Sequence, residues 1–199
     1  SFNTACCQNG TQFSVLHIFP CHNSFTQMLR CRVPETVWEM LRRHISQTQS
    51  QVSLFVLEQY DQILSGLSKE NIRDLRAVHR GLSAEQENLK KTRRKEFLAM
   101  RRIPQQIAIE RNTWFHLGAN CNQQYIYCLK RMLEPVKEHV DNNFNPLPRV
   151  YRDEFAPMHS KISELMTSTA HMLSTLEFHS YRETLAEADR CKDELSALR

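Results

Sequence analysis

Apolar residues recur every three or four positions along most of the chain after residue 33, which is the spacing of one face of an α-helix. The first of these runs starts at Pro34, a residue suited to the first turn of a helix. The pattern predicts a long helix that stops near Gly66, with Ser68 capping the next helix. The apolar positions of this first run are Val37, Leu41, Ile45, Val52, Phe55, Ile63 and Leu67.

A second helix is predicted from Lys69 to Ile103, where Pro104 ends it. Along this helix a heptad seam alternates between leucines and less apolar residues. Such a seam is expected where two long helices pack together and a third helix covers them. The seam consists of Leu75, Leu82 and Leu89 with Ile72, His79 and Gln86 at the alternate positions.

The third run begins near Ile107 and ends in a stretch rich in Asn and Pro, residues 141–148, which has the composition of a loop. Its stripe is expected to face the core, and Cys121 and Cys128 are expected to be small buried hydrophobes within it. The stripe consists of Trp114, Leu117, Cys121, Tyr125, Cys128, Met132, Val136 and His139.

Two further helices are predicted over 149–174 and 178–198, with Phe155 and Leu185 among their apolar residues. Long helices joined by short connections pack as antiparallel neighbours. The fold class is therefore all-α, an antiparallel bundle over residues 34–199. Residues 1–33 form an N-terminal segment of uncertain structure, in which 14–19 are either a short strand or an apolar stretch packed on the bundle.

Composition and motifs limit the classes of function that the sequence supports. The chain has only four glycines, and its seven cysteines contain no CxxC pair, so a phosphate loop or a zinc ribbon has no support. Its nine histidines include no HExxH arrangement, and no GxSxG turn is present. The sequence therefore predicts no catalytic residue, no cofactor and no enzyme. It also has no apolar run of the roughly 20 residues that cross a bilayer.

The formal charge of +4 is small, but cations gather in one place. This basic run is a candidate contact for an anionic membrane surface or a partner protein; the alternative is a solvated helix side. Nucleic acid is not expected, because only Phe97 interrupts the run as a stacking residue. At these spacings we expect the cations to wrap around the helix. The candidate residues are Lys90, Lys91, Arg93, Arg94 and Lys95.

A row of acids is the second candidate site. Glu134, Glu138 and Asp141 are spaced by four and three, which puts them on one side of a helix. Carboxylate oxygens are ligands for hard cations, so the row is a candidate metal site. The alternative is that the row simply faces water.

The end of the third helix carries a more specific signal. The segment Glu138-His139-Val140-Asp141-Asn142-Asn143-Phe144-Asn145-Pro146-Leu147 resembles one found in PhoU-like cytosolic domains of some bacterial transporters, of the inorganic phosphate transporter and sodium–phosphate cotransporter families. The stretches 67–75, 86–91 and 125–135 are similar to parts of the same domains. The resemblance covers about two-thirds of the chain.

This resemblance implies a PhoU-like bundle at the cytoplasmic face of a bacterial inner membrane. It implies that a transmembrane permease for inorganic phosphate belongs to the same natural chain and is the domain's partner. The basic run adds an anionic lipid surface as a candidate partner, and a homodimer is a further candidate. The metal signature E/DxxxD of free-standing PhoU proteins fits Asp189–Asp193, but Glu110 and Glu138 have no acid four residues further on, so no metal cluster is carried over.

Two hypotheses follow from these observations. The first is a regulatory domain that modulates phosphate uptake through its permease. The second is a free-standing PhoU-like interaction module in phosphate signalling, which the same bundle would serve.

Overall fold

The computed structural model describes residues 34–197, and every regular element in that range is a helix. The bundle is therefore all-α, as the apolar spacing predicts. The predicted strand or apolar stretch at 14–19 lies outside the described residues. The helices are α2 (Pro34–Ser68), α3 (Ile72–Met100), α4 (Gln105–Asp141), α5 (Arg149–Thr175) and α6 (Tyr181–Ala197).

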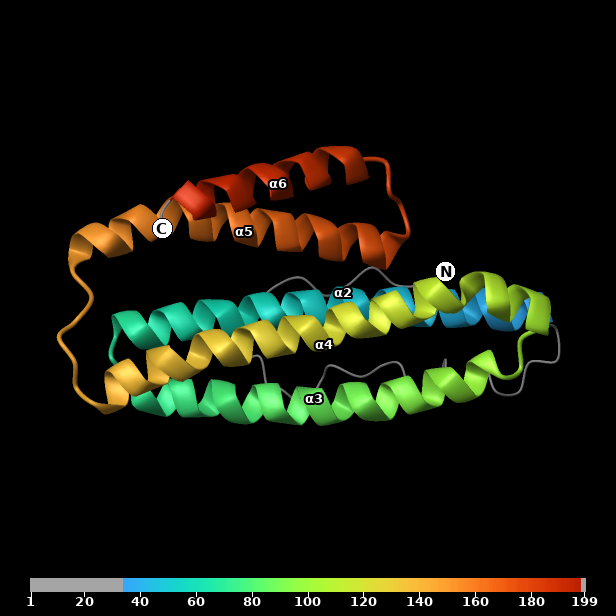
Figure 1. Cartoon of the computed structure of the whole chain (residues 1–199), viewed down its shortest axis with the longest axis horizontal. Coiled ribbons are helices and arrows are strands. Elements are labelled where there is room, and N and C mark those ends of the chain that lie inside the picture. Colours follow the sequence, from blue (N-terminus) through green and yellow to red (C-terminus); the bar gives the residue numbers. More distant parts are fainter. Residues whose placement is uncertain (1–33, 198–199) are drawn as a thin grey trace, which may run out of the picture.

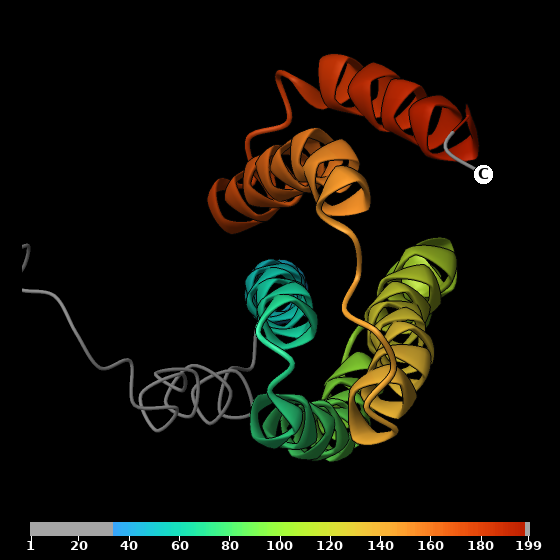
Figure 2. The same ribbon diagram turned by 90° about the vertical axis from the view of Figure 1, so that its left-hand side faces the viewer.

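The helices form two layers. Helices α2, α3 and α4 pack against one another, while α5 lies on α2 and α6 on α5 (Figure 1). The end view shows α2, α3 and α4 as the corners of a triangle, with the α5–α6 hairpin to one side (Figure 2). Helix α2 touches α3, α4 and α5, so it is the central helix of the bundle.

Local signals explain most of the helix ends. The side chain of Asn71 accepts a hydrogen bond from the Arg73 amide and so caps α3. Pro104 and Pro148 immediately precede α4 and α5. The predicted stop at Gly66 is wrong, because α2 continues to Ser68 and the capping residue is Asn71 rather than Ser68.

The core has two clusters, both built around α2. One lies towards the α2–α3 turn and includes the three leucines of the predicted seam, all of which are buried. The other surrounds the α3–α4 turn and contains Trp38, Leu41, Ile45 and Phe115. Apolar burial of this extent is the main stabilising contribution to such a fold.

The second layer is attached through polar groups. The hydroxyl groups of Ser46 and Ser50 on α2 donate hydrogen bonds of 2.7 Å to the carbonyl oxygens of Leu173 and Ala170 on α5. Small side chains of this kind bring two helix backbones close together. They also satisfy their own hydroxyl groups inside the interface.

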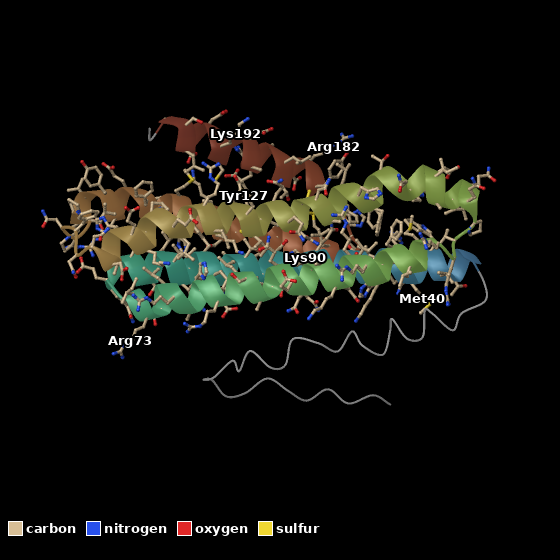
Figure 3. All side chains as sticks on the ribbon, turned by 60° about the horizontal axis from the view of Figure 1, so that its bottom comes forward. Met40, Arg73, Lys90, Tyr127, Arg182 and Lys192 are labelled. Atoms are coloured by element: carbon tan, nitrogen blue, oxygen red, sulfur yellow. The ribbon has the colours of Figure 1, made fainter. Side chains whose placement is uncertain are left out.

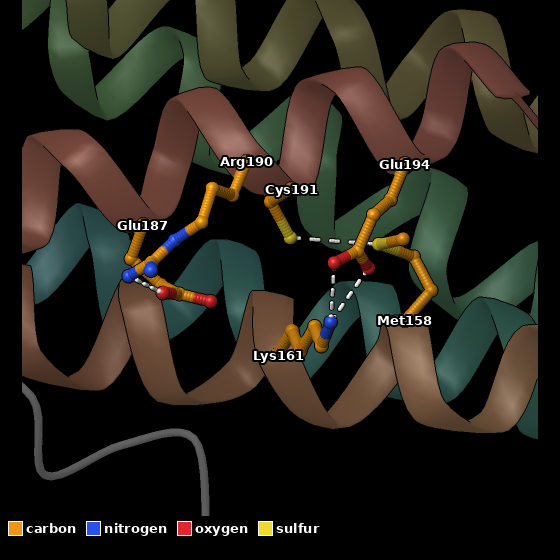
Figure 4. A network of polar contacts seen from close by, with 6 residues as sticks. All are labelled: Met158, Lys161, Glu187, Arg190, Cys191 and Glu194. Carbon is orange, nitrogen blue, oxygen red and sulfur yellow. Dashed lines mark hydrogen bonds and ion pairs between the residues drawn. The ribbon is translucent and has the colours of Figure 1, made fainter.

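The α5–α6 hairpin has its own set of contacts (Figure 4). The Lys161 ammonium lies 2.6 Å from both carboxylate oxygens of Glu194. Beside it, the Cys191 thiol lies against the sulfur of Met158, at 3.5 Å. This hairpin is held by few buried side chains, so we expect it to be less stable than the α2–α4 layer.

Candidate interaction surface on helix α3

The buried side of α3 determines where its cations lie. Because the buried residues recur at helical spacing, the opposite side of the helix must face solvent. The buried residues are Leu75, Val78, Leu82, Leu89, Glu96, Ala99 and Met100.

Most of the predicted cations lie on that solvent side. Four of the five are exposed, and only Arg93 is half-buried. Neighbouring cations in this run lie about 100° apart around the helix, so they cover a broad part of its surface, with Arg93 towards the core and the other four on the solvent side. We define the basic face as the exposed cations of this part of the chain: Lys90, Lys91, Arg94, Lys95, Arg101 and Arg102.

The basic face concentrates the positive charge of the protein. The segment from Lys90 to Arg102 holds seven of the 26 basic residues and one of the 22 acidic ones, so its formal charge is +6 and the rest of the chain carries −2. Lys90 is paired, because its Nζ lies 2.6 Å from a carboxylate oxygen of Glu87. The segment therefore presents a local positive field that the modest total charge conceals.

The single acid of this segment is hidden. Glu96 is 6% exposed and faces α2, where its carboxylate lies 3.7 Å from His44 Nε2. Burial raises the pKa of Glu96 to about 7, although Arg93 opposes the shift. Burial, helped by Lys95, lowers the pKa of His44. Both shifts favour the neutral form of the group concerned.

Two exposed apolar side chains lie among the cations. Leu98 is 56% exposed and Phe97 is 46% exposed. The guanidinium of Arg101 lies over the Phe97 ring, 5.2 Å from its centroid. Lys91 and Arg94 precede Leu98 by seven and four residues, so they lie on the same side of the helix as Leu98. The surface is therefore cationic with an apolar centre.

The basic face continues towards the start of α3. Arg73, Arg76 and Arg80 are exposed on the same side of the helix. Figure 3 shows Arg73 and Lys90 along α3, with Arg182 and Lys192 across the bundle on α6. Helix α3 has 29 residues, so this side is about 43 Å long.

The acid row does not assemble a cation site. Glu134, Glu138 and Asp141 are all exposed, and Asp141 pairs with Arg76 on α3 at 3.0 Å. Among residues 34–197, no three His, Cys, Asp or Glu side chains come together in a way that would hold a metal ion. In this structure Asp141 joins α4 to α3.

The structure corrects the interpretation of the third helix. The central residues of the predicted stripe form a row that faces solvent. The buried residues of α4 each follow a residue of that stripe by one position in the sequence, as Phe115 follows Trp114. The prediction that Cys121 and Cys128 are buried is therefore wrong, since both are exposed. The row is next to the core, because Trp114 meets Trp38 of α2 edge to face at 5.8 Å. Its exposed members are Trp114, Leu117, Cys121, Tyr125 and Cys128.

The two histidines assigned to the seams also differ from expectation. His79 is exposed, so its place in the leucine seam is wrong. His139 is half-buried, and its Nε2 has no hydrogen-bond partner in the described part of the chain. Its ring instead meets the edge of Phe144, with the centroids 5.7 Å apart.

The segment on which the phosphate-transporter resemblance rests closes α4. Asn143 adopts a left-handed conformation with φ of 52°, and the Phe144 amide donates to the His139 carbonyl oxygen at 3.2 Å. This is the arrangement of a Schellman C-cap. The segment therefore forms the connection between the α2–α4 layer and the α5–α6 hairpin.

Comparison with known proteins adds no identity. No protein-family model matches the chain, and no curated protein or solved structure matches it. Among the described residues, none of the helices combines the length and apolar character that a membrane span requires.

Proposed function

We propose that this chain is a regulatory domain of a bacterial inorganic phosphate transporter. It would work at the cytoplasmic face of the inner membrane, beside a permease that belongs to the same natural polypeptide. The observation that carries the proposal is the sequence of Glu138–Leu147, which resembles the corresponding segment of such domains.

The position of that segment supports a regulatory role. It connects the two layers of the bundle, so a change in its conformation would move the α5–α6 hairpin relative to α2, α3 and α4. The layers meet through the two serine hydroxyl bonds and a 2.6 Å pair between His159 of α5 and Asp61 of α2, while the buried residues of both apolar clusters lie between Val37 and Val140. Such an interface suits an element with two arrangements of similar free energy, which a regulatory domain requires.

The first experiment is a fractionation of native cells with an antibody against this domain. A band much larger than 23.5 kDa that only detergent extracts is the expected result. A band near 23.5 kDa in the soluble fraction would contradict the proposal and favour the free-standing interaction module.

The second experiment measures phosphate uptake directly. Deleting the domain should change the difference in uptake rate between phosphate-rich and phosphate-limited cells. The substitution Phe144→Ala in the α4–α5 connection should reproduce part of this change. Phe178→Ala in the α5–α6 connection is a matched control, because these phenylalanines are 55% and 45% exposed and both lie in loops. If the deletion left the phosphate uptake rates unchanged in both kinds of cell, regulation by this domain would be refuted.

A further inference from the structure

We infer that the solvent side of α3 and of the turn that follows it, from Arg73 to Arg102, is a binding surface for bilayers rich in anionic phospholipid, with Leu98 entering the headgroup layer. The inference deepens the proposed function, which places the domain beside a membrane. It rests on three features of α3: the distribution of charge, the exposed apolar residues and the shape of the helix side.

The charge selects an anionic partner. The segment from Lys90 to Arg102 carries a formal +6, while the rest of the chain carries −2. A flat anionic surface attracts each nearby Lys or Arg, and the binding constant rises about fivefold for each one. Two exposed acids oppose this attraction, because Glu87 pairs with Lys90 and Asp141 pairs with Arg76. The acid within the segment itself, Glu96, is turned into the core and is 6% exposed.

The exposed apolar residues favour lipid over other anionic partners. The centre of a protein–protein interface is apolar and contains many side chains. On the solvent side of α3 the exposed large apolar side chains are Phe97 and Leu98 alone. Single-stranded nucleic acid needs aromatic residues at repeated intervals for base stacking, and α3 offers only Phe97. At a membrane surface a single leucine among cations contributes to binding, because buried apolar area and attraction to anionic lipid both add to the affinity.

The shape of α3 suits a planar partner. Its exposed cations run from Arg73 and Arg76 through Arg80 to the basic face, a line of about 43 Å. Helices α5 and α6 lie on the other side of the bundle (Figure 2). The whole line can therefore touch a flat surface at once, without obstruction by the second layer.

The test uses the purified chain of 199 residues and two kinds of vesicle. One contains phosphatidylglycerol and phosphatidylethanolamine, and the other contains only phosphatidylcholine. The double variant Lys91→Gln, Arg94→Gln should bind the anionic vesicles about 25-fold more weakly than the unsubstituted chain. The double variant Arg182→Gln, Lys192→Gln is the matched control, because it also removes one exposed Lys and one exposed Arg, from α6.

The expected result is sedimentation with the anionic vesicles only, lost on raising the salt concentration, with the α6 control unchanged. A Leu98→Trp variant should show a blue shift in fluorescence on these vesicles, beyond any shift of the unsubstituted chain. Equal loss in both double variants would overturn the inference, since net charge alone would then account for binding.

Other outcomes also overturn the inference. The inference would be wrong if the chain did not bind anionic vesicles, or if it bound duplex DNA more tightly than lipid. Neither result would contradict the proposed function, because the vesicle experiment contains no permease. Regulation of uptake without vesicle binding would assign the basic face to the permease itself.

Discussion

The carboxyl group of Glu96 allows a quantitative test of how the bundle is packed. It lies between α3 and α2 at 6% exposure, with its carboxylate 3.7 Å from the Nε2 atom of His44 on α2. Burial raises its pKa from 4.5 to about 7. Replacing Glu96 by Gln keeps the size of the side chain and removes its ionisation.

The sign of the effect follows from proton linkage. Between pH 4.5 and about 7, the folded protein holds a proton on Glu96 that the unfolded chain has released. The stability contributed by the neutral carboxyl is therefore lost as the pH rises through this window, by about 3 kcal/mol in total. Glu96→Gln should raise the free energy of unfolding by about this amount near pH 8 and change it little near pH 4.5.

The neighbouring histidine acts in the opposite direction. Burial lowers the pKa of His44 below 6.5, so the folded state keeps it neutral while the unfolded chain takes up a proton. Its contribution is present at high pH and is lost as the pH falls below 6.5. Near pH 8 His44 is neutral in both states, and the measurement there reports on Glu96 alone.

The assay is urea unfolding followed by far-UV circular dichroism at a series of pH values, with the slope of each transition compared between variants. Glu134→Gln on the exposed side of α4 is the control and should leave the curve within about 0.5 kcal/mol of the unsubstituted chain. A loss of stability in Glu96→Gln at every pH would refute the reasoning. It would mean that an ionised Glu96 stabilises the fold through His44 or Arg93.

Three further outcomes follow from local packing. Gly66→Ala should lower the free energy of unfolding in urea by about 1–3 kcal/mol, because its new methyl group would lie 2.6 Å from the side chain of Leu75, a core residue of α3. The control Gly81→Ala should change it little, because the new methyl would lie 3.3 Å from the side chain of Gln59. Ser50→Ala should lower the unfolding free energy by about 1 kcal/mol and speed amide exchange in α5 and α6, because it removes a bond between the layers; unchanged exchange would contradict this. Brief alkylation analysed by mass spectrometry should modify Cys121 before Cys191, since only the latter is buried, and the reverse order would contradict the structure.

Much of the fold follows from local sequence. The predicted helices match α2 to α6 to within a few residues at each end, because apolar spacing, prolines and connecting residues act over one or two turns. The leucine seam of α3 is also buried as predicted. The candidate surface was also predicted from the sequence, because the five cations from Lys90 to Lys95 form an unusual run of like charge.

The errors have a common origin. Helix α4 carries two adjacent apolar rows, and periodicity could not say which row the neighbours would cover. Packing of α2 and α3 buries Phe115, Ile126 and Leu133, and leaves Leu117 and Cys121 in solvent. The same limit applies to α3, where the spacing alone did not show that Arg93 turns inward while its neighbours stay outside.

The sequence by itself therefore determined the helices, their order and the concentration of positive charge. These depend on dihedral preferences and on contacts within one helix, which neighbouring residues control. Only the tertiary structure decided which side of each helix is covered, that Glu96 lies next to His44, and that Leu98 stands exposed among cations. Those features depend on how distant helices are rotated against one another, and that rotation is set by the packing of all of them together.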